Sequence, residues 1–450
     1  MKIHPVTTFI LVLLAPVAAM AQPARAAIET LSLDAAVRMA VEHNRQIQTA
    51  RLEVDKADAD VAISRTKRLP TFDVEAKASQ LLTPVDFAFP AGAFGTFAGV
   101  GPIPAVDTNV SVPRQPIYYV SSQIAQPLTQ LFRINLGVRA AETAREIETQ
   151  KVKAQRLAIV NNVKQLYFAI LQTRSALVAN EEAIELYREL DRTLTVRVAQ
   201  KVALRGDALD VQYRLAQEQL TRISHENTLA SRKEQLNQLL GRDVRTAFDV
   251  DEAARVSVLD IDLDAAQRRA LAERPDLQQA RLALKQAELD RRIKHAERIP
   301  DVSVGVSYTS NFNIDIMPKN LASFGVQVKW EPFDWGRKRN ELTSKAHTVD
   351  QARLGVRDLE DRVVLEINSA FRTLTERRAF LAVAEMAQGT AREKLRVKTT
   401  QYQVQTALLP DVLQLRAELA ATDDRYQQAL LGFWTAKANF DNAVGEEVSR

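Results

Sequence analysis

Residues 31–70 read LSLDAAVRMAVEHNRQIQTARLEVDKADADVAISRTKRLP, and residues 261–300 read IDLDAAQRRALAERPDLQQARLALKQAELDRRIKHAERIP. The two segments align without a gap at a constant offset and share many residues, including the opening Leu-Asp-Ala-Ala and the closing proline. Each opens with an aspartate, Asp34 or Asp264, that suits a helix N-cap. Each ends at a proline, Pro70 or Pro300, that cannot continue a helix. The sequence therefore predicts an internal two-fold repeat in which each half begins with a helix.

A run that alternates apolar and polar residues follows each of these prolines. A period of two over about ten residues is typical of a tilted membrane strand. A similar return strand follows in each half, which predicts β-hairpins at 71–126 and 301–331. We expect one face of these four strands to contact lipid, and that face comprises Phe72, Val74, Val302, Val304, Val306, Val326, Val328 and Trp330.

A half-buried strand of a soluble sheet would show the same alternation. An isolated sheet with one apolar face needs a cover, however, and no other β-rich segment supplies one. Closure of strands from several copies into a membrane barrel covers that face with lipid and removes the sheet edges. The segment 81–116 is rich in proline and glycine and is predicted to be a long loop outside the cell, whereas the second loop, 309–322, is shorter.

Each hairpin is followed by helices of unusual length, predicted as helical hairpins at 128–240 and 336–445. Between Pro127 and Gly206 the only glycine or proline is Gly137, and at 1.5 Å per residue such a helix is on the order of 100 Å long. Its apolar residues keep a 3-4 spacing, which indicates coiled packing against other helices. The segment 241–262 interrupts this pattern as an equatorial insertion. The predicted fold is mainly α with a small β part.

The first residues have the pattern of a secretory signal peptide, predicted at 1–21. Lys2 precedes an apolar core from Phe9 to Ala19, and small residues allow cleavage after Ala21 or Ala26. Cysteine is absent, so the chain has no disulfide, no thiolate metal site and no lipid-modified cysteine. The 60 basic and 56 acidic residues are interspersed, which argues against a nucleic-acid partner because such proteins gather their basic residues in a patch.

Catalytic motifs are missing from the sequence. Four histidines, His43, His225, His295 and His347, are scattered singly along predicted helices, without the spacing of a metal site. No phosphate-binding loop, dinucleotide fingerprint or nucleophile elbow occurs. We therefore expect a protein without enzymatic activity, cofactor or metal.

Four short motifs, in their order along the chain, resemble the TolC family of outer-membrane efflux proteins. They are LDAA at 33–36, RPDL at 274–277, FDWGR at 333–337 and DVL at 411–413. The resemblance covers nearly the whole mature chain. It implies a homotrimer whose strands form one β-barrel in outer-membrane lipid, continuous with a long periplasmic α-barrel that is girdled by a collar at 241–262. It also implies two partners, a periplasmic adaptor and an inner-membrane RND or ABC transporter.

The two turns between long helices are predicted to dock the adaptor, through Leu204, Arg205, Gly206, Gln405, Thr406 and Ala407. The resemblance implies that Asp210 and Asp411 match pore-gating aspartates and that Tyr402 matches a tyrosine of the gate. Ala407 stands where that family has a gate arginine, and Gln414 stands where it has a second, inner aspartate. Each aspartate is expected to be the first acidic residue of a returning helix, and the simplest alternative role for it is a helix N-cap.

The function predicted from these features is that of an outer-membrane channel in a tripartite system that exports small molecules. One alternative is the outer-membrane component of type I protein secretion. Another is a soluble periplasmic coiled-coil scaffold, which would share the helical hairpins but would not need four lipid-facing strands.

Overall fold

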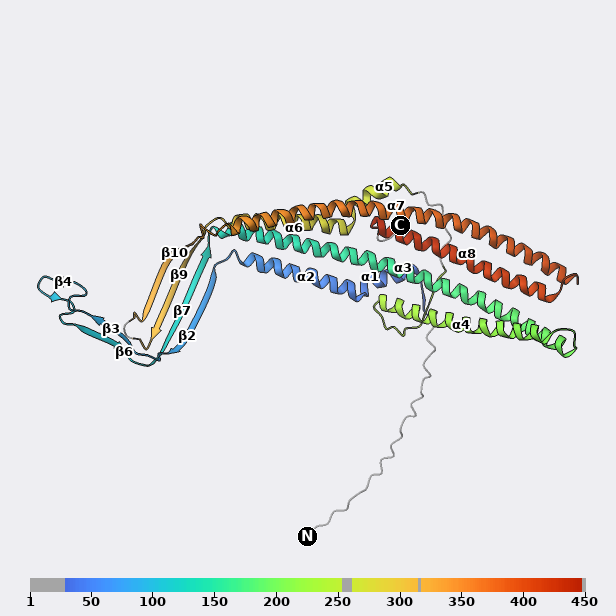
Figure 1. Ribbon diagram of the computed structural model, residues 1–450, viewed down its shortest axis with the longest axis horizontal. Helices are drawn as coiled ribbons and strands as arrows, with labels where there is room; N and C mark the ends of the chain where they lie inside the picture. Colours follow the sequence, from blue (N-terminus) through green and yellow to red (C-terminus); the bar gives the residue numbers. More distant parts are fainter. Residues whose placement is uncertain (1–28, 253–260, 315–316, 447–450) are drawn as a thin grey trace, which may run out of the picture.

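A shaft of long helices forms most of the molecule, with a four-stranded sheet at one end (Figure 1). The computed structural model describes residues 29–252, 261–314 and 317–446, so the predicted signal peptide and its cleavage after Ala21 or Ala26 lie outside the described residues. A mainly α fold with a small β part is confirmed. No helix in the described ranges combines the length and the apolar composition that a membrane crossing requires.

Each opening segment forms two helices rather than the single helix that was predicted. In the first half α1 (Leu33–His43) and α2 (Arg45–Thr66) meet at Asn44, and in the second half α5 (Leu263–Glu273) and α6 (Pro275–Ala296) meet at Arg274. The Asn44 side chain accepts hydrogen bonds from the first turn of α2, and its Nδ2 donates to the carbonyl of Leu239 at 2.8 Å. The break in the first half is therefore fixed by a residue distant in sequence.

The N-caps of α1 and α5 are Ser32 and Asp262, so the prediction that Asp34 and Asp264 cap these helices is wrong. Ser32 Oγ accepts from the Ala35 amide, and Asp262 Oδ1 accepts from the amide of Asp264 at 2.9 Å. Asp34 and Asp264 instead lie in the first turn, where a negative charge is favourable next to the positive end of the helix dipole.

Four long helices make up the shaft: α3 (Gln130–Ala199), α4 (Arg205–Leu239), α7 (Arg337–Gln403) and α8 (Leu409–Val444). In the half of the shaft away from the sheet, they lie side by side in the order α4, α3, α8, α7. In the half near the sheet, α2 and α6 take the places of α4 and α8. The layer is therefore four helices wide along the whole length of the shaft.

A short two-stranded sheet lies against the middle of α3. In it β1 (Glu29–Leu31) pairs in parallel with β8 (Phe248–Val250). The hydroxyl of Tyr167, on α3, donates to the carbonyls of Leu31 at 2.9 Å and Asp251 at 3.0 Å. Beside it, Gly241 has φ +74° and lies so close to α1 that a Cβ would come within 2.2 Å of the His43 carbonyl oxygen. We call β1, β8 and α1, together with α5, the counterpart of α1 in the second half, the collar.

The sheet at the end of the shaft contains β2 (Thr71–Gln80), β7 (Pro116–Pro127), β9 (Asp301–Phe312) and β10 (Asn320–Lys329). Its order is β10-β9-β7-β2, and all neighbours are antiparallel. One cross-strand row runs through Phe72, Ile124, Val306 and Phe324. Because side chains alternate along a strand, the apolar strand residues identified in the sequence share one face of this sheet. Trp330 lies one residue beyond the end of β10.

Polar side chains bond to one another across the opposite face of the sheet. The Tyr119 hydroxyl donates to Glu75 Oε1 at 2.9 Å, and the hydroxyls of Ser307 and Ser323 are 2.7 Å apart. The sheet therefore has one apolar and one polar face.

The segment predicted as a long loop contains strands. Here β3 (Val85–Phe89) pairs with β6 (Thr108–Val112), and β4 (Thr96–Phe97) pairs with β5 (Gly101–Pro102) at the tip. These strands form an arm that extends beyond the sheet (Figure 1). The prediction missed these strands because the many prolines indicated a loop, although short runs of alternating apolar and polar residues lie between them.

Candidate functional site at the helical tips

Two turns close the helical hairpins at the end of the shaft farthest from the sheet (Figure 1). One joins α3 to α4 and the other joins α7 to α8. Each has a left-handed residue at the same place, Lys201 with φ 60° and Gln405 with φ 61°. Each returning helix then starts after a leucine with extended backbone, Leu204 or Leu408. The two turns therefore have the same backbone geometry.

Apolar side chains are exposed at both turns. Leu204 is 73% and Leu408 63% exposed, and Val202 and Val404 are similarly open. The residues predicted to dock the adaptor lie at these tips, but the two sets are not equivalent. Gln405, Thr406 and Ala407 belong to the turn itself, whereas Leu204 is the N-cap of α4, and Arg205 and Gly206 begin the helix.

Three carboxylates lie within the first six residues of the helices that return from the tips. Asp207 and Asp411 are each the third residue of their helix, and Asp210 and Gln414 are each the sixth. The prediction that Asp210 is the first acidic residue of α4 is wrong, because the helix begins at Arg205 and Asp207 comes before it. Sequence reasoning missed Asp207, although counting from the two turns would have found it.

The N-cap interpretation of Asp210 and Asp411 is also wrong. The N-cap positions are Leu204 and Leu408, and neither helix has a side-chain cap. Asp210 instead forms an ion pair with Arg214 one turn later, at 3.2 Å. Both partners are more than half exposed, so the pair adds little stability. Hydrogen bonds to Tyr187 and Asp210 raise the pKa of the Arg214 guanidinium above its ordinary value.

Tyr402 lies in the last turn of α7, and its carbonyl accepts a hydrogen bond from the amide of Gln405. Within the described chain no hydrogen bond or ion pair joins Tyr402 to Asp210, Asp411 or Gln414. One copy therefore presents these residues at the ends of two separate hairpins.

The two outer helices of the layer expose apolar stripes. On α4 the stripe contains Tyr213, Leu220 and Ile223, and on α7 it contains Val383 and Met386. Each of these side chains is at least half exposed. Contiguous apolar surface of this kind usually marks a contact with another molecule.

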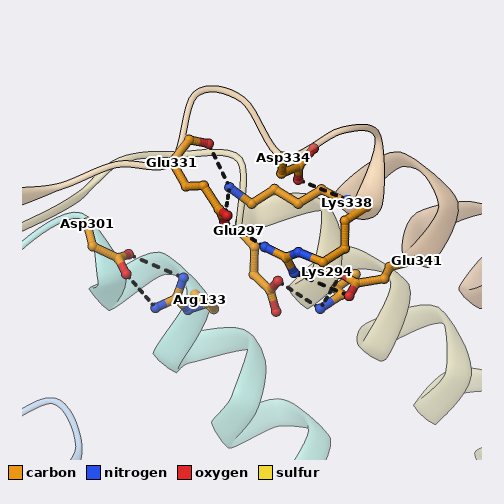
Figure 2. A network of polar contacts seen from close by, with 9 residues as sticks. Arg133, Lys294, Glu297, Asp301, Glu331, Asp334, Lys338 and Glu341 are labelled. Atoms are coloured by element: carbon orange, nitrogen blue, oxygen red, sulfur yellow. Dashed lines mark hydrogen bonds and ion pairs between the residues drawn. The ribbon is translucent and has the colours of Figure 1, made fainter.

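A network of charged side chains joins the sheet to the shaft (Figure 2). Lys294, on α6, donates to Glu297 at 2.8 Å and lies 2.9 Å from Glu341 on α7. These hydrogen bonds raise the pKa of the Lys294 ammonium, and the bond from Lys294 lowers the pKa of the Glu341 carboxyl. Arg133, on α3, pairs with Asp301 at the start of β9 at 3.2 Å. The strands and helices are thus tied together at several points.

The sequence FDWGR at 333–337 forms the turn between β10 and α7. Gly336 has φ 85°, a left-handed conformation that favours glycine. Asp334 accepts hydrogen bonds from the amides of Gly336 and Lys338, at 3.1 and 3.0 Å. The amide of Lys338 is the main cause of a lowered pKa for the Asp334 carboxyl. This motif therefore shapes the start of α7.

A sequence model described as outer membrane efflux protein matches residues 36–242 and 266–446, which is most of the chain. The chain belongs to the outer membrane efflux protein family. The resemblance predicted from the four sequence motifs is confirmed, together with an outer-membrane location and a role in efflux at the level of the family. The family is one of channel proteins, with which the expectation of a non-enzymatic protein is consistent.

One curated relative of this efflux protein is an uncharacterized protein of Haemophilus influenzae. It is 22% identical over 241 residues, and the match covers 53% of this chain and 52% of that protein. The chain thus spans about half the length of the curated relative it matches.

Three solved structures have a similar fold. The CmeC outer membrane channel of Campylobacter jejuni gives a TM-score of 0.75 at 15% identity, covering 93% of this chain and 87% of that chain. A membrane protein from Pseudomonas aeruginosa gives a TM-score of 0.73 at 18% identity, covering 94% of this chain and 92% of that chain. The outer membrane protein VceC of Vibrio cholerae gives a TM-score of 0.69 at 16% identity, covering 92% of this chain and 96% of that chain. At sequence identities this low, the similarity shows a shared fold and nothing further.

Proposed function

We propose that this efflux protein is the outer-membrane channel of a tripartite export system, a passive conduit for small molecules from the periplasm to the exterior. The observation that carries the proposal is the sheet β10-β9-β7-β2, which has an apolar face and two unpaired edge strands and stands at the end of a shaft on the order of 100 Å long. Unpaired edges are not tolerated in lipid. Strands from further copies would close the sheet into a barrel.

The proposed assembly is a homotrimer. Its support comes from the two edges of the helical layer, since the stripe on α4 and the stripe on α7 lie on opposite sides of one copy. Packing α7 of one copy on α4 of the next is a head-to-tail contact, which closes into a ring when the rotation allows. In such a ring the apolar stripes are buried and the shaft becomes a tunnel.

The periplasmic entrance of this tunnel is proposed to lie at the helical tips. Three copies would bring together three sets of Asp207, Asp210 and Asp411, which would attract cations. Single-channel recording tests this role. We expect Asp411→Ala and Asp210→Ala each to weaken cation preference and block by divalent cations. Unchanged preference and block in both variants would remove these residues from the entrance.

The tips are also the proposed docking site for a periplasmic adaptor, which in turn would contact an inner-membrane RND or ABC transporter. The support is the pair of matched turns with exposed apolar residues, of which a trimer would present six. Crosslinkable residues at Gly206 and Thr406 should capture the adaptor in cells. Capture from the collar alone would contradict this mode of docking.

Fractionation and conductance test the whole proposal. The protein should be found in the outer membrane as a heat-labile trimer that resists mild detergent, and the purified trimer should conduct ions in planar bilayers. Deletion should raise sensitivity to drugs or bile salts. A soluble periplasmic product without conductance would instead support the scaffold, and a deletion that abolishes release of a secreted protein alone would support type I secretion.

A further inference from the structure

A hollow lies on the face of the helical layer opposite the collar. Its volume is about 940 Å³, and it extends over α3 and α8 between α4 and α7. Uncharged amide side chains dominate its polar lining, together with one guanidinium; they include Gln165, Gln172, Gln235, Gln238, Gln428 and Arg377. Apolar contact surface comes from side chains such as Phe380 and Leu166.

The positions along α3 show that the hollow and the collar occupy different faces. Val163 and Tyr167 pack in the collar core, whereas Gln165 and Gln172 line the hollow. At about 100° per residue these two pairs point to opposite sides of the helix. In a closed ring of copies the collar would girdle the outside, so the hollow would face the tunnel. This step rests on the proposed trimeric channel.

Positive charge in the hollow is not neutralised by a carboxylate. Arg377 is the charged residue of the lining, and within the described chain its guanidinium has no hydrogen-bond or ion-pair partner. Its side chain passes Gly432 on α8, where a Cβ would lie 3.9 Å from Arg377 Cδ. A guanidinium stays protonated at any physiological pH. The charge is therefore permanent and open to a solute.

Two further charged side chains, one of each sign, lie beside the hollow. Arg232, on α4, donates to the carbonyl of Ala169 and to the Thr173 hydroxyl rather than to a carboxylate. Asp424, on α8, accepts a hydrogen bond from the side-chain Nε2 of Gln428 at 2.6 Å and does not pair with Arg377. Ala169 and Gln428 both line the hollow. Within the described chain, neither Arg232 nor Arg377 forms an ion pair with a carboxylate.

We propose that this hollow is a cargo-contact site for organic anions that carry an aromatic or apolar body. Arg377 attracts the anionic group, Phe380 and Leu166 contact the apolar body, and the surrounding amides offer donors and acceptors. Three copies place three such sites at one level of the tunnel, far from the acidic tips. The tunnel then has an acidic entrance and a basic middle.

Block of the purified trimer in planar bilayers tests the proposal, with 1-naphthalenesulfonate as the anionic probe and 1-naphthalenemethanol as its uncharged analogue. Arg377→Gln should weaken block by the sulfonate about fivefold, the upper range for an exposed ion pair. Arg377→Lys keeps the charge and should retain most of the block. Block by the alcohol should be the same in all proteins.

The matched control is Arg378→Gln, which removes the same charge from the next residue of α7, a residue that does not line the hollow. It should leave block by the sulfonate unchanged. A conducting Arg377→Gln channel with wild-type block, or an equal loss in Arg378→Gln, overturns the inference and leaves the channel function intact. Absence of conductance in the wild-type trimer overturns the proposed function itself.

Discussion

Replacement of Tyr167 by phenylalanine should loosen the N-terminal strand from the shaft. Tyr167 is 2% exposed, and its hydroxyl lies within hydrogen-bond distance of two carbonyls, those of Leu31 and Asp251. Burial raises the pKa of this hydroxyl to about 12, so it remains a donor throughout the physiological range. Phenylalanine keeps the edge-to-face contact with Phe168, whose ring centroid is 6.2 Å away, and removes only the donor.

The size of the effect follows from what the lost donor leaves behind. A buried acceptor without a partner costs about 1–3 kcal/mol. The Leu31 carbonyl keeps a second hydrogen bond, from the Asp251 amide at 3.2 Å, which favours the lower part of that range. One or two kcal/mol corresponds to roughly a 5–30-fold change in an opening equilibrium. Hydrogen exchange, followed by mass spectrometry of peptides that contain 29–31 and 248–252, should accelerate by that factor.

Tyr213→Phe is the control for this experiment, because Tyr213 is 66% exposed on α4. It should leave exchange in the collar unchanged, and both variants should leave exchange in the middle of α7 unchanged. If Tyr167→Phe exchanges in the collar at the wild-type rate, the hydroxyl does not hold β1 and β8 to α3.

Three further outcomes are expected. Glu341→Gln should remove an acid-sensitive step at the junction of sheet and shaft. Hydrogen bonding from Lys294 lowers the Glu341 pKa below its ordinary 4.5. The ionised carboxylate therefore stabilises the junction fully above pH 4.5, and this stabilisation is lost as the pH falls through the pKa of the folded state. Limited proteolysis of the junction between pH 5 and 3 should show this step in the wild type, and the same step in Glu341→Gln would contradict the assignment. Val306→Arg should cost about 2–4 kcal/mol in folding titrations into bilayers and Ser303→Arg much less, whereas equal costs would refute the lipid-facing assignment. Lys437→Met should destabilise the protein by about 1–3 kcal/mol, because the buried Asp441 carboxyl loses its hydrogen-bond partner, now 2.5 Å away at Lys437 Nζ. Loss of helical circular dichroism on heating measures this cost, and a Lys437→Met, Asp441→Leu double variant that melts no higher than the single one would argue against the pair.

The long helices could be predicted from the sequence because their apolar residues recur with helical period over many turns. The break at Asn44 was missed, although asparagine is a favoured N-cap residue and its side chain caps α2; only its bond to Leu239, a partner remote in sequence, leaves no local signal. In the second half a local signal was present, because proline is favoured in the first turn of a helix and Pro275 begins α6.

The candidate site at the helical tips was predictable only in part, again because contacts between distant residues leave no local pattern. Both tips were located, but the start of α4 was not, because Leu204 is not a capping residue and gives no signal. Asp207 was missed as a consequence. The role of Tyr167 could not be predicted, because its partners, Leu31 and Asp251, lie far from it along the chain. The hollow around Arg377 combines four helices, which no single segment of sequence reveals.

The pairing of β1 with β8 sets an order of events as the chain emerges on the far side of the inner membrane. The N-terminal strand arrives first, yet its partner lies beyond the entire first helical hairpin. The entropic cost of closing so long a loop grows only slowly with its length, but contacts between distant segments form late. In the described residues, the hydrogen-bond and ion-pair partners of β1, including Tyr167 and Val250, belong to the first half of the chain. That half can therefore complete its part of the collar before the second half has crossed.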